Sequence, residues 1–149
     1  MKTAIVYYSK HHENTKQLLD AIRQDSGDEV TLIDVTTSPT VDLAKYDRIG
    51  YASGIYFSKF EKKLVEFAKN NTPAGKDVFL IYTCGAEKDS YTKSIREALA
   101  SCNAHVLGEY GCLGFDTYGP FKLIGGIAKN HPNSDEVAGA VAFYKNLHA

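Results

Sequence analysis

The chain alternates short apolar runs with longer stretches in which apolar residues recur every three or four positions. The runs are rich in β-branched and aromatic residues, which is typical of strands buried on both faces. They predict five strands, at residues 4–8, 29–35, 46–53, 77–83 and 104–112. The longer stretches have the period of amphipathic helices. They predict four helices, at residues 15–23, 57–71, 91–102 and 134–147, the last with Ser134 as its N-cap.

The regular alternation of strand and helix predicts the fold class. A helix between two strands allows them to lie parallel in one sheet, and successive crossovers place helices on both faces. We therefore expect an α/β fold with a doubly wound, five-stranded parallel sheet. The chain has 149 residues, of which 44% are hydrophobic. This is enough for a full core, so a single domain over residues 1–149 is expected.

In sheets of this class, ligands bind beyond the carboxyl ends of the strands. Four segments follow predicted strand ends: residues 9–15, 53–58, 83–89 and 113–133. The first leads directly into a helix, whose unpaired N–H groups and dipole stabilise an anion. The second and third offer small residues for close approach, and Tyr56 and Phe57 offer aromatic faces. Together these segments predict a site for a flat, phosphorylated heteroaromatic ligand.

Charge and composition exclude several functions. Seventeen Lys and Arg residues oppose eighteen Asp and Glu residues, so the net charge of −1 argues against binding to nucleic acid. No apolar run reaches the roughly 18 residues of a membrane span, and we expect a cytoplasmic protein. The three cysteines, Cys84, Cys102 and Cys112, are scattered. They predict neither a disulfide framework nor a metal site.

Two segments resemble a known family. YYSKHHENTKQLLDAI resembles the first-strand phosphate loop of flavodoxin-like proteins, and SGIYFSKF resembles their second flavin loop. The resemblance covers essentially the whole chain, and it implies a flavodoxin fold of strand order 2-1-3-4-5 that binds FMN. It also implies three groups of cofactor-binding residues, which hold the phosphate, border the isoalloxazine and meet its pyrimidine side. In that order they are Ser9, His11, Asn14 and Thr15; Ser53, Gly54, Ile55 and Tyr56; and Thr83, Cys84 and Gly85.

The chain departs from the family pattern in two places. The usual phosphate loop reads S/T-x-T-G-x-T, whereas here Ser9 and Thr15 are one residue further apart, and no glycine lies between them. We expect His11 or His12 to supply charge to the phosphate instead, so FMN affinity should rise between about pH 8 and about pH 6. The segment 113–133 is longer than the usual connection. Its aromatic residues could form a wall beside the flavin, and it could serve as a homodimer surface.

The resemblance leaves several functions open. One is electron transfer with a redox partner protein, although a net charge of −1 is weak for steering a partner. Another is an FMN-dependent reductase or oxidase of a quinone or small aromatic substrate, similar to the flavodoxin-type protoporphyrinogen oxidases. A binding module without a cofactor is a further alternative. A phosphoacceptor receiver of the same fold needs acidic residues at the ends of strands one and three, and the chain has Ser9 and Ser53 there. The sequence therefore argues against a receiver.

Overall fold

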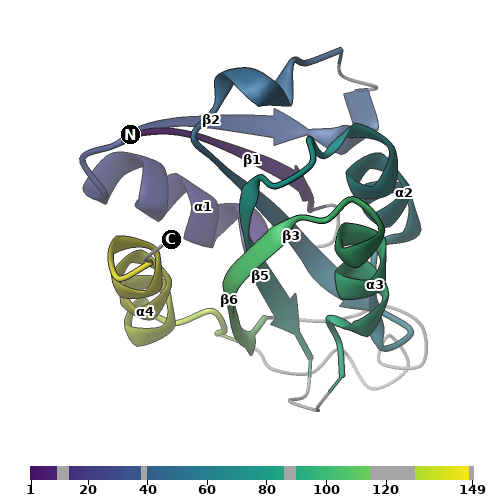
Figure 1. Ribbon diagram of the computed structural model, residues 1–149. Helices are drawn as coiled ribbons and strands as arrows, with labels where there is room; N and C mark the ends of the chain where they lie inside the picture. The colour runs from purple at the N-terminus through teal and green to yellow at the C-terminus, as the bar shows by residue number, and fades with distance from the viewer. Residues whose placement is uncertain (10–13, 38–39, 86–89, 115–129, 148–149) are drawn as a thin grey trace.

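A computed structural model describes residues 1–9, 14–37, 40–85, 90–114 and 130–147 (Figure 1). Its centre is a sheet with five long parallel strands in the order β2-β1-β3-β5-β6. Counted along the chain, this is the order 2-1-3-4-5, so the predicted fold is confirmed. The strands are β1 (Lys2–Tyr8), β2 (Glu29–Asp34), β3 (Arg48–Tyr56), β5 (Asp77–Cys84) and β6 (His105–Leu113).

In the part of the chain that the structure describes, helices cover both faces of the sheet, two on each (Figure 1). The helices α1 (Asn14–Asp25) and α4 (Ser134–Lys145) pack on one face, and α2 (Lys62–Asn71) and α3 (Lys93–Ser101) pack on the other. Successive residues of β1 alternate between the two cores, because side chains of a strand point to opposite faces. Leu18, Leu19 and Ile22 of α1 are fully buried. Each contributes about 1.5–3 kcal/mol through the hydrophobic effect.

The predicted helix over residues 57–71 is wrong at its start. β3 continues to Tyr56, the chain reverses at Phe57 and Ser58, and β4 (Lys59–Phe60) pairs antiparallel with β3. Both turn residues have positive φ, 50° and 65°, as a two-residue type I′ hairpin turn requires. Phe60 is 2% exposed, so it packs in the core from a strand rather than from a helix.

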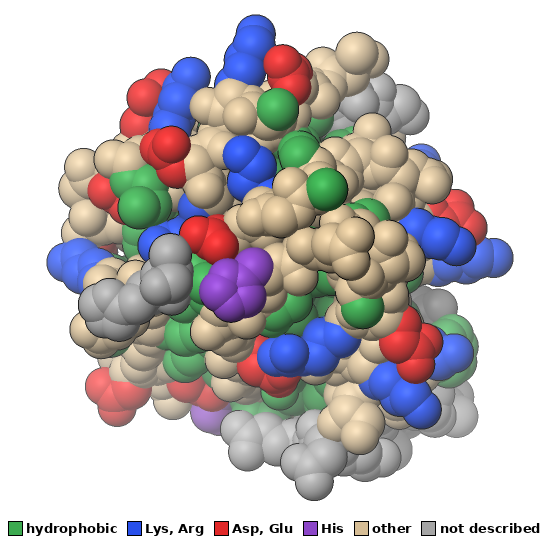
Figure 2. Space-filling view, in the orientation of Figure 1, with side chains coloured by type: hydrophobic (Ala, Val, Ile, Leu, Met, Phe, Trp, Pro, Cys, Tyr) green, Lys and Arg blue, Asp and Glu red, His purple; other side chains and the backbone are tan. Residues whose placement is uncertain are grey.

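Other element boundaries also differ from the prediction. The N-cap of α4 is Asn133 rather than Ser134, and Asn133 forms a capping box with Glu136. The connection after β2 contains two 3₁₀ turns, η1 (Val35–Thr37) and η2 (Leu43–Lys45), in a segment expected to be irregular. On the face shown in Figure 2, basic and acidic side chains lie interspersed. None of the described helices is both long and apolar enough to cross a membrane.

Candidate functional site at the carboxyl edge of the sheet

The carboxyl ends of the central strands bring the predicted site residues to one edge. Thr83 of β5 lies in register with Gly54 of β3 on one side and with Cys112 of β6 on the other. β3 and β5 extend past the predicted strand ends at residues 53 and 83, so most of the predicted site residues in these segments lie within strands. These residues are Ser53, Gly54, Ile55, Tyr56, Thr83 and Cys84. The strand ladder therefore fixes their backbone positions.

The start of α1 is bonded to the end of β5. The hydroxyl oxygens of Thr15 and Thr83 are 2.8 Å apart, and the two side chains are 1% and 3% exposed. The Lys16 N–H donates to Ser9 Oγ at 3.4 Å, which draws the end of β1 toward the same turn. The first turn of α1 contains no acidic residue. The positive end of the helix dipole is thus directed at this edge without a carboxylate of that turn to neutralise it.

Asn14 and Gly114 approach each other closely at this edge. The Gly114 N–H donates to the Cys84 carbonyl at 2.9 Å. A Cβ atom on Gly114 would lie only 2.8 Å from Asn14 Nδ2, so only glycine fits without a shift. The helix start, the end of β5 and the residue after β6 are therefore packed together. Sequence reasoning did not single out Gly114, although a glycine two residues after the end of a predicted strand was an available signal.

Two of the predicted residues have structural contacts within the protein. Ser53 is fully buried, and its hydroxyl donates to the Gly54 carbonyl and accepts from the Glu61 N–H at 3.1 Å. This side chain therefore holds the base of the hairpin. Ile55 pairs with Phe60 of β4 and packs against the core. Gly54 and Tyr56 are half-buried, which leaves them partly accessible at the edge.

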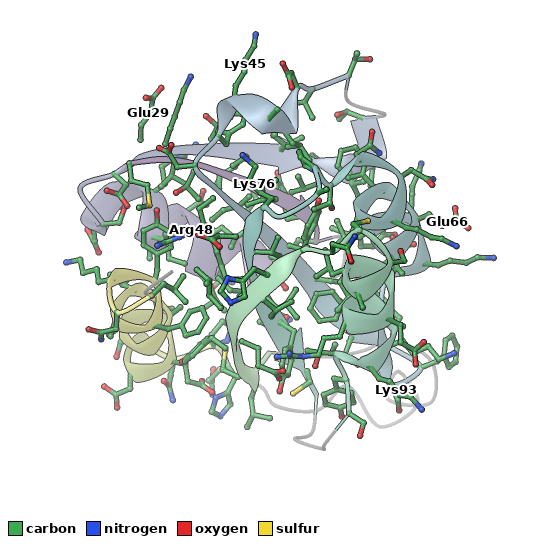
Figure 3. All side chains as sticks on the ribbon, viewed as in Figure 1. Glu29, Lys45, Arg48, Glu66, Lys76 and Lys93 are labelled. Atoms are coloured by element: carbon green, nitrogen blue, oxygen red, sulfur yellow. The ribbon has the colours of Figure 1, made fainter. Side chains whose placement is uncertain are left out.

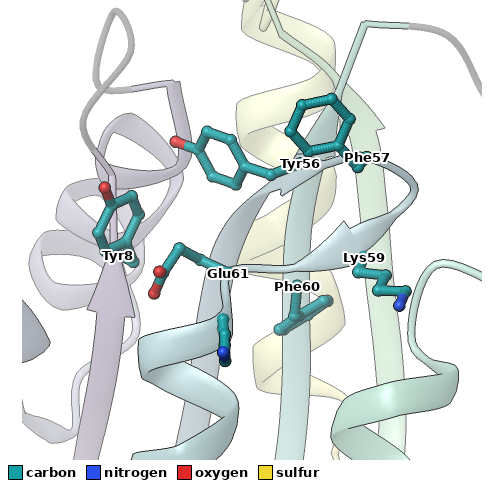
Figure 4. A pocket seen from close by; sticks show the side chains of 7 residues that line it. Tyr8, Tyr56, Phe57, Lys59, Phe60 and Glu61 are labelled. Carbon is teal, nitrogen blue, oxygen red and sulfur yellow. The ribbon is translucent and has the colours of Figure 1, made fainter.

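A pocket of about 410 Å³ opens beside the hairpin (Figure 4). Tyr8 and Tyr56 meet edge to face in it, with ring centroids 5.6 Å apart and planes at 87°. Its volume and aromatic walls suit a small flat ligand. Of its lining residues, Tyr56 and Phe57 were expected to offer aromatic faces to a ligand, whereas the others depend on the hairpin. The lining consists of Tyr8, Tyr56, Phe57, Lys59, Phe60, Glu61 and Lys62.

Glu136 of α4 forms a hydrogen bond with the backbone at the end of β6. One carboxylate oxygen accepts from the Leu113 N–H at 3.2 Å, and the other lies 2.5 Å from His131 Nδ1 and accepts from the Asn133 N–H at 2.9 Å. Burial raises the pKa of the Glu136 carboxyl, but the hydrogen bonds outweigh it and hold the pKa below its usual value. Glu136 is therefore ionised at neutral pH. The spacing of Asn133 and Glu136 was a local signal for the capping box, but the bond from Glu136 to Leu113 has no local signal.

The remaining predicted features are His11, the segment 113–133, Cys84 and the expected lack of a metal site. His11 and most of the segment 113–133 lie outside the described residues. The thiol of Cys84 is buried and donates to the Cys112 carbonyl at 3.5 Å. Within the described part of the chain, no three His, Cys, Asp or Glu side chains gather as metal ligands.

Comparison with known proteins identifies the family. The flavodoxin domain family matches residues 5–113. The uncharacterized protein MJ0298 of Methanocaldococcus jannaschii is 38% identical over 149 residues, which cover 99% of this chain and 98% of that protein.

Solved structures with little sequence identity share the fold. A flavodoxin from the domain Archaea superposes with a TM-score of 0.70 at 16% identity, over 96% of this chain and 94% of that one. The rubredoxin oxygen:oxidoreductase of the anaerobe Desulfovibrio gigas also gives 0.70, at 14% identity, over 98% of this chain but 35% of the larger protein. The fold, the family match and the relative agree. The chain belongs to the flavodoxin domain family.

Proposed function

We propose that this protein binds FMN at the carboxyl edge of its sheet and acts as an electron-transfer protein. The observation that carries the proposal is the buried Thr15–Thr83 contact. It joins the start of a helix, which favours a phosphate, to the strand end that would face the flavin. Membership of the flavodoxin domain family supports the same cofactor.

The residues at the edge fit the parts of FMN. Ser9, Asn14 and Thr15 would hold the phosphate together with the unpaired N–H groups of α1. The half-buried ring of Tyr56 offers an aromatic face, and Gly54 beside it has no side chain to obstruct a flat ring. The strand end with Thr83 would meet the polar pyrimidine side. When bound, FMN supplies one- and two-electron transfer, and the protein sets its access to water and partners.

His11 belongs to the proposal as the donor that replaces the missing glycine of the phosphate loop. Its expected signature is an FMN dissociation constant that decreases between about pH 8 and about pH 6, as the imidazole gains a proton. The change should disappear in His11→Gln and persist in His12→Gln. An unchanged constant over this range in the wild-type protein would exclude the role.

A second candidate function is an FMN-dependent reductase or oxidase of a quinone or small aromatic substrate. The observation that favours it is the aromatic pocket beside Tyr56, whose volume of about 410 Å³ lies in the range of ligand sites. Because Tyr56 belongs both to this pocket and to the proposed flavin site, a substrate in the pocket would lie beside the flavin. Reduction of the holoprotein by NADH or NADPH, followed by turnover of menadione, would support the enzyme over the shuttle.

The colour of the purified protein tests whether it binds FMN. A yellow protein that releases FMN on denaturation supports the proposal. A colourless protein that takes up no added FMN contradicts it and favours the cofactor-free binding module. Both outcomes are read by absorbance and by chromatography of the released compound.

A further inference from the structure

Lysines gather where the hairpin leads into α2. Lys59, Lys62 and Lys63 are exposed, and among the residues that the structure describes none of them forms an ion pair. Residues 57–71 contain four lysines and two glutamates, a net charge of +2, whereas the whole chain carries −1. One of these glutamates, Glu61, accepts from the Leu64 N–H at the start of α2. The segment is therefore a locally basic surface on a slightly acidic protein.

An exposed aromatic residue lies at one end of this basic surface. Phe57, at the tip of the hairpin, is 76% exposed. The positive φ angles of Phe57 and Ser58 hold this tip in a tight turn that non-glycine residues adopt at a cost of about 1 kcal/mol each. An exposed aromatic side chain beside charged ones is typical of protein interfaces, in which aromatic anchors are enriched and the rim is polar.

Two of these lysines, Lys59 and Lys62, belong to the lining of the pocket, whereas Lys63 lies outside it. In Figure 4 the Lys59 side chain extends away from Tyr56. A small ligand in the pocket would contact only part of this charge, whereas a macromolecule that covers the hairpin and the start of α2 would contact Lys63 as well. The surface therefore favours a protein over a small ligand as its occupant.

We infer that the hairpin and the start of α2 form a docking surface for an acidic redox protein that exchanges electrons with the flavin. The inference rests on the proposed function, since the electrons go to the bound FMN. Charge complementarity argues for an acidic partner, because opposite charges raise association rates by about tenfold to a thousandfold. Each one-electron carrier gives up one electron, so two encounters reduce one FMN, and the accompanying protons come from solvent.

The test uses a reduced plant-type [2Fe–2S] ferredoxin as the acidic partner and reduced cytochrome c as the basic one. The second-order rate constant for flavin reduction by ferredoxin should fall about tenfold or more between low salt and about 0.5 M salt. The variant Lys59→Glu/Lys62→Glu should be about tenfold slower than wild type at low salt, with a flat salt dependence. Binding to the two partners is also compared by titration. The wild type should bind cytochrome c more weakly than ferredoxin, whereas the variant should bind cytochrome c more tightly than ferredoxin.

A control reverses the charge of one lysine away from the hairpin, with half the change in net charge of the double variant. Lys45 is exposed and lies in η2, ahead of the amino end of β3, whereas the hairpin follows the carboxyl end of this strand (Figure 3). Lys45→Glu should therefore react with ferredoxin as the wild type does. Equal rates for wild type and Lys59→Glu/Lys62→Glu, or a wild-type rate that rises with salt, would overturn the inference.

The failure of FMN binding would be distinguishable from the failure of docking. If the protein binds no FMN, ferredoxin can still be titrated into the ¹⁵N-labelled protein. Docking predicts amide shift changes centred on residues 56–63 that disappear in Lys59→Glu/Lys62→Glu. Shift changes elsewhere, or none at low salt, would overturn the docking surface independently of the cofactor.

Discussion

The hydroxyl oxygens of Thr15 and Thr83 lie 2.8 Å apart in a buried position, and they join residues 68 positions apart in the sequence. This contact fixes the start of α1 against the end of β5. Because a buried hydroxyl without a partner is costly, Thr15→Val should lower the free energy of unfolding by about 1–3 kcal/mol. Urea unfolding of the apoprotein measures the loss.

The double variant shows whether the two hydroxyls act together. Thr15→Val/Thr83→Val removes both polar groups and leaves none unpaired. Its loss of stability should be smaller than the sum of the single losses by about 1 kcal/mol. Strictly additive losses would show that the hydroxyls do not interact.

The hairpin turn is strained, and glycine should relieve the strain. Ser58 has a φ of 65°, a conformation that glycine adopts without steric cost. Ser58→Gly should raise the free energy of unfolding by about 1 kcal/mol. The control Glu97→Gly replaces an exposed residue inside α3, where glycine should cost about 0.5–1 kcal/mol instead. Thermal and urea unfolding check both, and destabilisation by Ser58→Gly would contradict the turn geometry.

The close approach of Gly114 and Asn14 predicts that a side chain at position 114 destabilises the protein. A methyl group there would meet three atoms of Asn14 within 2.9 Å, so Gly114→Ala should cost about 1–3 kcal/mol of stability. The loss should be smaller in an Asn14→Ala background, which removes two of the three contacts. Gly54→Ala is the control, because its nearest neighbour would be 3.5 Å away. Equal effects of the two alanines would refute the contact.

Glu136 predicts a pH-dependent contribution to stability. Burial raises its pKa, yet the hydrogen bonds from Asn133, His131 and Leu113 leave it below the usual value. A carboxyl with a lowered folded-state pKa stabilises the fold above its unfolded pKa, and it loses this contribution as the pH falls through the folded-state pKa. Glu136→Gln should thus be less stable than wild type at pH 7, by about 1.5–3 kcal/mol. The difference should shrink below the usual pKa of a glutamate, at about pH 4. A pH-independent difference in urea unfolding would contradict this.

The fold could be predicted because its signals are local. The apolar runs of β1 and β5 are buried on both faces, which leaves no polar alternation to mislead the assignment. The edge that carries the site followed from topology alone. The single domain, the cytoplasmic location and the homodimer remain predictions.

The details of the site could not be predicted because they depend on contacts between distant residues. The period of Phe60 and Leu64 matches a helix, but Phe60 reaches the same core from β4. The pocket beside Tyr56 exists only once this hairpin forms. Glu136 reaches Leu113 across 23 residues, and no pattern in the sequence records that bond.

The most direct test of the central claim compares FMN with riboflavin, which lacks the phosphate. If the start of α1 holds the phosphate, FMN should bind the apoprotein in a 1:1 ratio, and about a hundredfold more tightly than riboflavin. This ratio corresponds to about 2.7 kcal/mol, the worth of one or two charge-assisted hydrogen bonds. Quenching of flavin fluorescence in a titration gives both dissociation constants. Equal affinities for the two flavins, or no binding of either, would contradict the claim.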